Sequence, residues 1–260
     1  MTRWVRGNLQ DLADAAVARS SRLRRFAAAS SWAEAAAVTD GYESMTANKT
    51  ADALRSWDRP KTRLDARELQ AVAAFGTAIV ALDSPTVRVV DVGGWDAHYS
   101  RAIRSSYPRV TFRWSVLETE GAANALEERP HPDWLEWSAD ADALFGREVD
   151  IAFASGALNY FEKPIPFLDR LMRVCEFVVL TRLPLWPIDA HRPAAQFVKR
   201  GSREGCPTWF FSDQLFRQHV KRAGGRIIAE WDVPQDSAFF AGHRCDYQGL
   251  VIDCRGERGS

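Results

Sequence analysis

The spacing of apolar residues changes near Arg88. Upstream the spacing is helical: residues 30–44 (SSWAEAAAVTDGYES) combine serines that can cap a helix, an alanine-rich body, and an Asp-Gly stop at positions 40 and 41. Residues 65–82 (DARELQAVAAFGTAIVAL) have the apolar spacing of a helix that lies on a sheet, and Ser84-Pro85 ends it. The pattern predicts an N-terminal helical extension over residues 1–82, which either caps a site or forms a dimer face.

Downstream, short apolar runs alternate with helical segments. Residues 87–92 (VRVVDV) are rich in valine, as expected of a strand covered on both faces. Further strands are expected at residues 110–117, 133–137, 150–154, 177–180, 226–231 and 249–254, with one helix ending at residue 103 and others at 121–128, 164–174 and 212–223. This alternation predicts an α/β fold over residues 83–260, with a doubly wound, mostly parallel, seven-stranded sheet.

The composition is that of an ordinary globular protein. Apolar residues make up 46% and charged residues 26% of the chain, and 34 basic residues balance 34 acidic ones, which argues against nucleic acid as a partner. No apolar run approaches the roughly 20 residues of a membrane span, and the N-terminus lacks the apolar core of a secretory signal. Residues 1–26 are expected to form a weakly amphipathic helix, with the basic run Arg19–Arg25 on a solvated face.

The cysteines, at positions 175, 206, 245 and 254, contain no Cys-x-x-Cys pair. Without an export signal, this predicts reduced thiols in the cytoplasm rather than a disulfide framework or a zinc site, and no metal is expected. No Gly-x-Ser-x-Gly elbow, His-Glu-x-x-His motif or P-loop points to another catalytic class.

The stretch DVGGWDAHY, residues 91–99, joins the first predicted strand to a helix. In doubly wound sheets, ligands bind beyond the carboxyl ends of the strands. Gly93 and Gly94 let the backbone turn tightly and approach a ligand, while Asp91 can hold the loop or accept a hydrogen bond from a cationic group. Glu118 ends the next strand, where an acid can bind both hydroxyls of a ribose. A tight turn without a ligand is the alternative.

An acid at the position of Glu118 is shared by enzymes that use dinucleotides and enzymes that use S-adenosylmethionine (SAM). The glycine pattern is DVGGWDA rather than Gly-x-Gly-x-x-Gly, so the cradle for a pyrophosphate is incomplete. This difference favours SAM.

Several segments, in order along the chain, resemble a small and largely uncharacterised family of class I SAM-dependent methyltransferases. That family often occurs among bacterial surface-polysaccharide and sugar-modification genes. The segments, which fall between residues 30 and 252, are SSWAEAAAVTDGYES, DVGGWDAHY, WSVLE, SGALNYFEKP, VVLTRLP and CPTWFFSDQLF.

The resemblance implies a class I methyltransferase (Rossmann-like) fold with SAM as the cofactor. It also implies a set of cofactor-binding residues: Asp91, Gly93, Gly94, Trp95, Tyr99, Glu118, Asp140, Ala141, Ser155 and Gly156. Asp140 stands where many class I methyltransferases place the acid that meets the adenine amino group, and a helix cap is its alternative role. Trp95 occupies a place where the family loop tends to carry a further glycine, and a bulky side chain there can narrow the pocket.

Tyr160, Arg182, His98 and His191 are the candidates for contact with the acceptor or for catalysis. Tyr160 stands where class I enzymes often place a His or Tyr near the acceptor, although a tyrosine at a sheet edge is equally plausible. Arg182 follows a buried strand and can grip a carboxylate or phosphate, unless it forms a salt bridge to a nearby acid. Either histidine can act as a general base at neutral pH, although a lone histidine is more often structural.

The function predicted is methyl transfer from SAM to a hydroxyl or amine of a small polar acceptor, with a sugar or sugar nucleotide as the candidate class. Trp186 and the run Trp209-Phe210-Phe211 can wall a sugar-binding cleft, or they belong to the core. One alternative is an NAD(P)-dependent oxidoreductase, against which the absent Tyr-x-x-x-Lys pair counts. Another is a non-catalytic SAM-binding or scaffold protein whose pocket is spoiled by Trp95.

Overall fold

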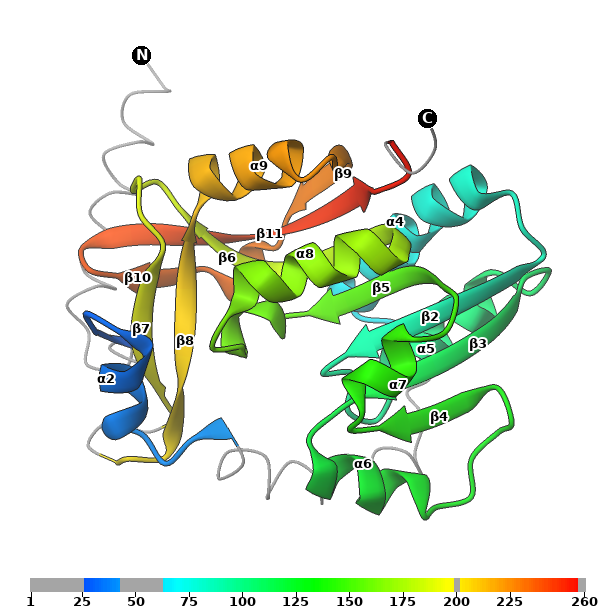
Figure 1. Ribbon diagram of the computed structural model, residues 1–260, viewed down its shortest axis with the longest axis horizontal. Helices are drawn as coiled ribbons and strands as arrows, with labels where there is room; N and C mark the ends of the chain where they lie inside the picture. Colours follow the sequence, from blue (N-terminus) through cyan, green and yellow to red (C-terminus); the bar gives the residue numbers. More distant parts are fainter. Residues whose placement is uncertain (1–25, 43–62, 199–201, 257–260) are drawn as a thin grey trace.

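The computed structural model describes residues 26–42, 63–198 and 202–256, and a central sheet runs through the whole molecule (Figure 1). The order of its central strands is β4 (Leu135–Ser138), β3 (Thr111–Leu117), β2 (Thr86–Val92), β5 (Val149–Ser155), β6 (Cys175–Trp186), β11 (His243–Asp253) and β9 (Arg226–Asp232). These strands pair in parallel except at β11, which is antiparallel to both neighbours. The predicted doubly wound, mostly parallel, seven-stranded sheet is confirmed.

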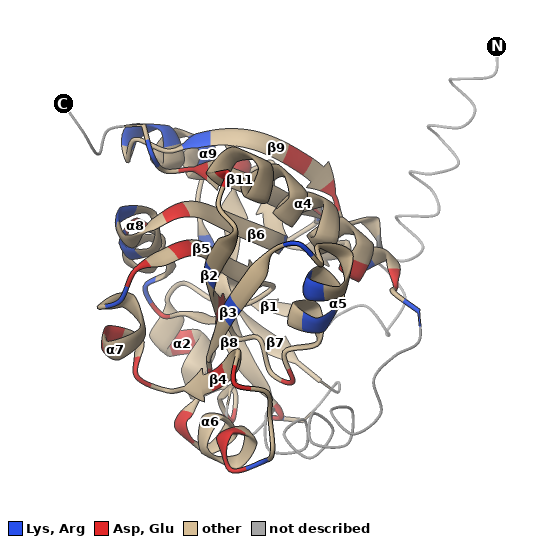
Figure 2. Cartoon of the chain, turned by 90° about the vertical axis from the view of Figure 1, so that its right-hand side faces the viewer, with Lys and Arg blue, Asp and Glu red and all other residues tan. Residues whose placement is uncertain are grey.

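Helices cover both faces of this sheet (Figure 2). The helices on one face are α4 (Ala66–Leu82), α5 (His98–Ser106) and α6 (Glu120–Glu127), and those on the other are α7 (Ala141–Phe145), α8 (Pro164–Val174) and α9 (Asp213–Arg222). Val89 packs with the first group and Val90 with the second, because neighbouring side chains of a strand point to opposite faces. Both faces of β2 are therefore buried, which explains its valine-rich sequence.

The N-terminal segment holds one expected helix and one unexpected strand. Helix α2 (Trp32–Ala37) begins at Ser31, whose side chain accepts a hydrogen bond from the backbone N–H of Glu34, as the capping serines predict. Strand β1 (Phe26–Ala28) precedes it and pairs with β7. The helix expected over residues 1–26, with its basic run, lies almost entirely outside the described residues. The division of the chain at residue 82 stays a prediction.

A second, antiparallel sheet continues from the end of β6. It consists of β1, β7 (Arg192–Phe197) and β8 (Gly205–Ser212), and β8 pairs with the last two residues of β6. The hydrophobic pattern does not reveal β7 and β8 because Pro193 and Pro207 lie inside them, and proline usually argues against a strand. This sheet and β10 (Ala238–Phe240) enclose a small core cluster around Trp186, Phe210 and Phe240.

Strand β6 is much longer than the predicted residues 177–180. Its continuation is not evident from the sequence because the polar pair Thr181-Arg182 interrupts the apolar run. Opposite this pair, between Gln248 and Leu250, the pairing of β6 with β11 shifts register. Arg182 has a left-handed backbone, with φ 58°. An irregularity of this kind often re-aims a side chain beside a functional site.

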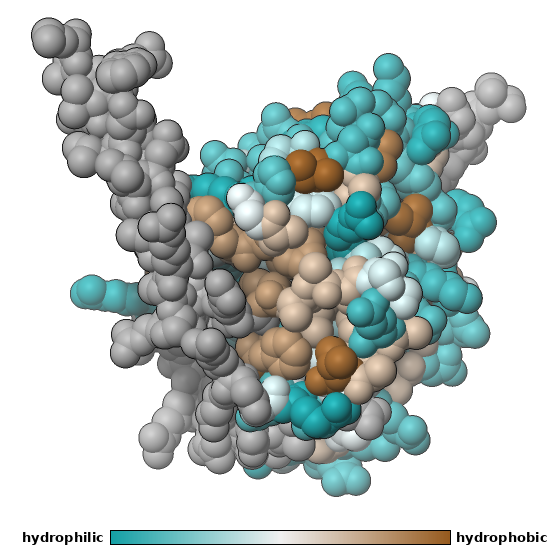
Figure 3. Space-filling model, turned by 90° about the vertical axis from the view of Figure 1, so that its left-hand side faces the viewer, coloured by the Kyte–Doolittle hydropathy of each residue, from teal (hydrophilic) through white to brown (hydrophobic). Residues whose placement is uncertain are grey.

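The side of the molecule that carries β7 and β10 has apolar side chains gathered near its centre, with hydrophilic ones around them (Figure 3). The cysteines all lie in the described part of the chain and are buried. None of the helices in residues 26–42, 63–198 and 202–256 has the length and apolar character needed to cross a bilayer.

Candidate functional site

A cavity of about 320 Å³ lies at the carboxyl ends of β2, β3 and β5. Its size is within the range of small-molecule sites, and its place is where doubly wound sheets bind ligands. The residues that line it are Tyr42, Gly93, Leu117, Glu118, Thr119, Ala139, Ala141, Ala157, Tyr160, Phe161 and Phe167. Gly93, Glu118, Ala141 and Tyr160 in this set are residues that the sequence pattern predicts for the site.

The glycine turn after β2 forms the floor of the cavity. Gly93 has a φ of +70°, and its N–H donates to the carbonyl of Leu117 over 2.8 Å. A Cβ on Gly93 would lie 2.9 Å from the Cβ of Ala157, and one on Gly94 would overlap the carboxyl group of Asp91. Both positions therefore need glycine, the first for its conformation and both for space.

Asp91 is buried beneath this turn. The indole N–H of Trp114 donates to its Oδ2 over 3.2 Å, while Oδ1 has no hydrogen-bond partner among the described residues. Burial raises the pKa of this carboxyl to about 8, and the negative charges of Glu118 and Asp96 add to the rise. A cation or an N–H donor of a ligand would stabilise the carboxylate here, because an unpaired buried charge is costly.

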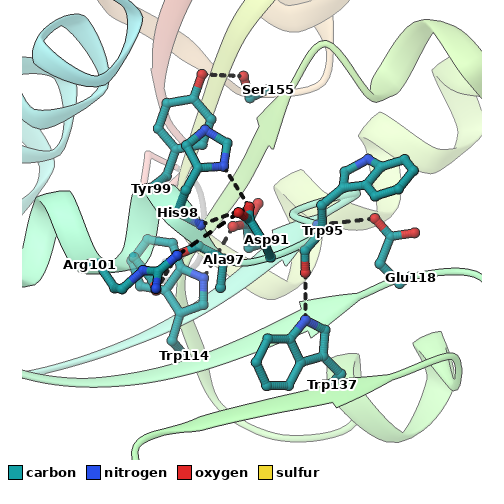
Figure 4. A network of polar contacts seen from close by, with 12 residues as sticks. Asp91, Trp95, Ala97, His98, Tyr99, Arg101, Trp114, Glu118, Trp137 and Ser155 are labelled. Carbon is teal, nitrogen blue, oxygen red and sulfur yellow. Dashed lines mark hydrogen bonds and ion pairs between the residues drawn. The ribbon is translucent and has the colours of Figure 1, made fainter. Parts of the chain in front are cut away.

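Glu118 is fixed at the rim of the cavity by two backbone groups. The N–H of Trp95 donates to its Oε1 (Figure 4), and the N–H of Thr119 donates to its Oε2, both over 3.1 Å. These bonds hold the carboxylate in one orientation, as recognition of a pair of hydroxyls requires.

Trp95 does not fill the cavity. It has a left-handed backbone, with φ 49°, and its carbonyl accepts a hydrogen bond of 2.6 Å from the indole of Trp137. Its own indole is partly buried beside Tyr42, outside the cavity lining.

Asp140 caps helix α7. Its Oδ1 accepts a hydrogen bond of 2.9 Å from the backbone N–H of Ala143, which is the alternative role considered for this residue. The cavity is lined instead by the alanines on either side, Ala139 and Ala141.

Ser155, Gly156 and Tyr99 form a second group with Arg182, beside the cavity lining. The Oγ of Ser155 donates to the Tyr99 hydroxyl over 3.1 Å, and the N–H of Gly156 donates to the carbonyl of Thr181 over 2.8 Å. Gly156 has a φ of +63°, and a Cβ on it would come within 3.3 Å of the Arg182 side chain. The loop after β5 therefore passes directly under Arg182.

Arg182 forms the predicted alternative, a salt bridge, but uses only one nitrogen for it. Its Nε donates to Oδ2 of Asp236 over 2.8 Å, and Oδ1 of Asp236 accepts from Arg67 over 2.5 Å. The terminal NH groups of Arg182 form no hydrogen bond within residues 26–42, 63–198 and 202–256. The triad has one positive charge in excess, and the unused part of the guanidinium can bind an anion.

Tyr160 lines the cavity, and its hydroxyl donates to Oε1 of Gln196 on β7 over 2.8 Å. Burial raises the pKa of this hydroxyl to about 12, so it remains protonated at neutral pH and cannot act as a base there. The hydrogen bond from Tyr160 to Gln196 connects β7 of the second sheet to the wall of the cavity.

The two histidines have different surroundings. Nδ1 of His98 is 2.9 Å from Oδ1 of Asp96, and its ring lies 4.1 Å from that of Tyr99. Nδ1 of His191 accepts from the backbone N–H of Ser212 over 3.1 Å, and burial lowers the pKa of this histidine. Neither contact involves a residue of the cavity lining. His98 belongs to the Tyr99 group, and His191 braces the end of β8.

Aromatic residues that sequence reasoning missed complete the cavity. Phe161 and Phe167 stack with ring centroids 4.1 Å apart, and Tyr42 reaches the cavity from the N-terminal segment. The GY pair at residues 41 and 42 was the one signal for Tyr42. Of the Trp209-Phe210-Phe211 run, both phenylalanines are core residues, whereas Trp209 donates to the carbonyl of Phe161 over 3.1 Å.

Comparison with known proteins finds solved structures that are similar to this chain, but no matching family model or curated sequence. No protein-family model matches the chain, and no curated protein matches its sequence. The N-terminal domain of EvdMO1 with S-adenosylhomocysteine (SAH) bound is 15% identical, with a TM-score of 0.52 over 74% of this chain and 83% of that one. The Burkholderia thailandensis 1,6-didemethyltoxoflavin-N1-methyltransferase, with 1,6-didemethyltoxoflavin and SAH bound, is 14% identical, with a TM-score of 0.53 over 87% of this chain and 92% of that one.

The chain has the class I methyltransferase fold. This agrees with the resemblance of the sequence segments and with the place of the cavity. In a doubly wound sheet, the loops after the carboxyl ends of the strands are the ones expected to meet a ligand, and here the loops after β2, β3, β4 and β5 line the cavity.

Proposed function

We propose that the protein is a SAM-dependent methyltransferase that transfers a methyl group to a hydroxyl or amine of a small polar acceptor, with a sugar or sugar nucleotide as the candidate class. The observation that carries this proposal is the cavity bounded by Glu118 and the turn at Gly93. A carboxylate fixed by two backbone N–H groups suits the ribose hydroxyls of the cofactor. A glycine turn with no room for a Cβ suits close backbone contact.

The other residues of the cavity fit the remaining parts of SAM. Ala139 and Ala141 on one side and the stacked Phe161 and Phe167 on the other offer apolar surfaces for an adenine ring. Asp91 lies beneath the turn, outside the cavity lining, and a ligand that carries positive charge would favour the ionised form of this carboxyl. When bound, SAM supplies a methyl group made electrophilic by its sulfonium.

The acceptor side is assigned to the group around Arg182. Its terminal NH groups and the nearby Tyr99 hydroxyl can bind polar or anionic groups of an acceptor. The loop after β5 links this group to the cavity, because Ser155 and Gly156 belong to the group while Ala157 and Tyr160 line the cavity. If the nucleophile is a hydroxyl, His98 is the better placed base, since Asp96 fixes its Nδ1 and leaves Nε2 to accept a proton. His191 uses its Nδ1 to hold Ser212. A homodimer and a cytoplasmic location are retained as predictions.

Calorimetric titration with SAH, NAD⁺ and NADP⁺ tests the proposal. We expect micromolar binding of SAH alone, weakened at least tenfold by Glu118→Ala and abolished by Gly93→Val, because that side chain would meet Ala157 at a left-handed position. Glu148→Ala, at a carboxylate that is 82% exposed, is the matched control and should bind SAH normally.

Three outcomes contradict the proposal in different ways. Binding of a nicotinamide nucleotide in place of SAH would favour an oxidoreductase. No binding of any of the three would favour a scaffold protein. SAH binding without methyl transfer to any acceptor in a panel of sugars, sugar nucleotides and amines would leave a SAM-binding protein and refute the enzymatic activity.

A further inference from the structure

Arg182 lies where β6 extends beyond the end of β5. The last pair of the two strands joins Ser155 to Thr181, so Arg182 is the first residue of β6 past the carboxyl end of its neighbour. Its backbone is left-handed, with φ 58°, and β11 shifts register opposite it. A non-glycine residue adopts this conformation at a cost in stability, and such strain clusters at sites that bind ligands.

Two contacts hold the guanidinium of Arg182 in place. Its Nε donates to Oδ2 of Asp236 over 2.8 Å, and Gly156 passes so close that a Cβ there would lie 3.3 Å from Nη1. The terminal nitrogens of Arg182 have no hydrogen-bond partner in the described part of the chain. A guanidinium that is fixed through Nε alone can donate from its other nitrogens to the oxygens of an anion.

The charges beside Arg182 favour a negative group. Arg67 and Arg182 share one carboxylate, because each oxygen of Asp236 is bound by one of the two arginines. Two positive charges therefore face one negative charge. The side chain of Asp236 is only 12% exposed, whereas that of Arg182 is 34% exposed, so Arg182 remains within reach of a solute.

Tyr99 adds a neutral hydrogen-bond donor to the charge of Arg182. Its hydroxyl accepts a bond of 3.1 Å from Oγ of Ser155, which leaves its own proton for another acceptor (Figure 4). Ser155 lies opposite Thr181 and precedes Gly156, the residue that passes under Arg182. The Tyr99 hydroxyl is thus held at the same loop as the guanidinium.

The loop after β5 also brings Arg182 close to the cofactor cavity. Gly156 contacts Arg182, and the next residue, Ala157, lines the cavity at the turn of Gly93. Methyl transfer requires the nucleophile to meet the methyl group in line and at close distance. An acceptor bound to Arg182 would lie one residue along this loop from the cavity, as this requirement demands.

We infer that Arg182 and Tyr99 form a subsite for an anionic group of the acceptor, a carboxylate or a phosphate. The acceptor is then an acidic or phosphorylated sugar rather than a neutral one. Tyr99, which the sequence resemblance assigns to the cofactor, takes part in acceptor recognition instead. This inference deepens the proposed function and rests on it, because it concerns the acceptor of the same reaction.

Nuclear magnetic resonance titration of the SAH-loaded full-length protein with three sugars tests the inference. Glucuronate carries a carboxylate, glucose 1-phosphate carries a phosphate, and glucose carries neither. We expect at least one of the two anions to bind tenfold or more tightly than glucose, because charge-assisted hydrogen bonds to Arg182 are made only with an anion. The anion with the lower Kd identifies the group that the subsite accepts.

Substitutions in the subsite should weaken binding of that anion by different factors. Arg182→Gln removes the charge and should raise the Kd at least tenfold. Arg182→Lys keeps the charge but loses the planar fork, and it should raise the Kd about 3- to 10-fold. Tyr99→Phe removes one neutral donor and should raise the Kd by about the same factor as Arg182→Lys.

Two matched controls remove the same kinds of group elsewhere. Arg226→Gln removes an arginine that is 75% exposed and paired with Asp253, and Tyr107→Phe removes a hydroxyl that donates to the carbonyl of Val72. Both should leave the Kd of the anion unchanged. Thermal unfolding of each variant shows whether the fold is retained. A purely structural role of Arg182 or Tyr99 would lower the unfolding temperature and leave the Kd of the anion for the folded protein unaltered.

Two failures can be told apart. If the unsubstituted protein does not bind SAH, the proposed function is wrong and the inference falls with it. If it binds SAH and neither anion binds more tightly than glucose, the proposed function stands and the inference is overturned. The inference is also overturned if the anion binds Arg182→Gln and Arg182→Lys as tightly as it binds the unsubstituted protein.

Discussion

Replacing Asp91 with asparagine tests the energetic cost of the acid beneath the glycine turn. Burial raises the pKa of this carboxyl from 3.8 to about 8 in the folded protein. Between these values the native protein holds a proton that the unfolded chain has lost, so the free energy of unfolding falls as pH rises. One proton corresponds to about 1.4 kcal/mol per pH unit, so the loss between pH 4 and pH 7 is roughly 4 kcal/mol.

The Asp91→Asn protein has no proton to lose at this position. Its amide oxygen can still accept from Trp114, while the free energy of unfolding should lose that part of its pH dependence. Urea unfolding of both proteins at pH 5, 6, 7 and 8, without ligand, measures the difference. The gap should shift in favour of the variant by about 1.4 kcal/mol per unit up to pH 8. Asp133→Asn, at an exposed position, is the control. Parallel profiles for Asp91→Asn and the unsubstituted protein would refute the reasoning.

Four further substitutions test the packing and the ion pairs. Gly94→Ala should destabilise the fold by about 1–3 kcal/mol, because the new Cβ would overlap the Asp91 carboxyl. Gly121→Ala, in helix α6 with open space around it, should stabilise the fold by up to ~1 kcal/mol. Equal urea midpoints for the two variants would contradict this reasoning. Asp253→Asn should lower the free energy of unfolding by about 2 kcal/mol at pH 7, because hydrogen bonds from Arg255 lower the Asp253 pKa to about 2. In urea unfolding, this difference between the variant and the unsubstituted protein should vanish as pH falls from 4 to 2. A difference that persists at pH 2 would have another cause. Asp236→Asn should lower the free energy of unfolding by about 1–3 kcal/mol. This is less than expected for a fully buried ion pair, because the side chains of Arg67 and Arg182 are 37% and 34% exposed. An unchanged thermal midpoint would show that the Arg67–Asp236–Arg182 triad contributes nothing to stability.

The sequence pattern predicted the central sheet because its strands are local. Runs of valine and other apolar residues at 87–92 and 110–117 describe strands buried on both faces, whatever the rest of the chain does. Helix α8 has the predicted bounds, since Pro164 begins it and an apolar stripe continues to Val174. By contrast, β7 and β8 depend on pairing with each other and with β1, and their prolines conceal them.

The same distinction between local and long-range contacts explains which residues of the candidate site could be predicted. Gly93 and Glu118 follow directly from the ends of β2 and β3, so their place at the cavity could be predicted. Tyr42 could not, because no local pattern tells which residues of an N-terminal segment will reach a cavity built by residues 93–167. For Asp140, the sequence left two roles open, adenine contact and helix cap. The choice between them depends on where α7 begins.

The pairing of β1 with β7 has a consequence for synthesis of the chain. Phe26 lies opposite Gln196, 170 residues later in the chain. A ribosome that adds about 5–20 residues per second needs roughly 10–35 s to make the partner strand after β1 has been made. During that interval β1, and the segment that leads from it to Tyr42, have no second sheet on which to dock. The nascent protein therefore gains its complete cavity late, after the central strands β2 to β6 have been synthesised.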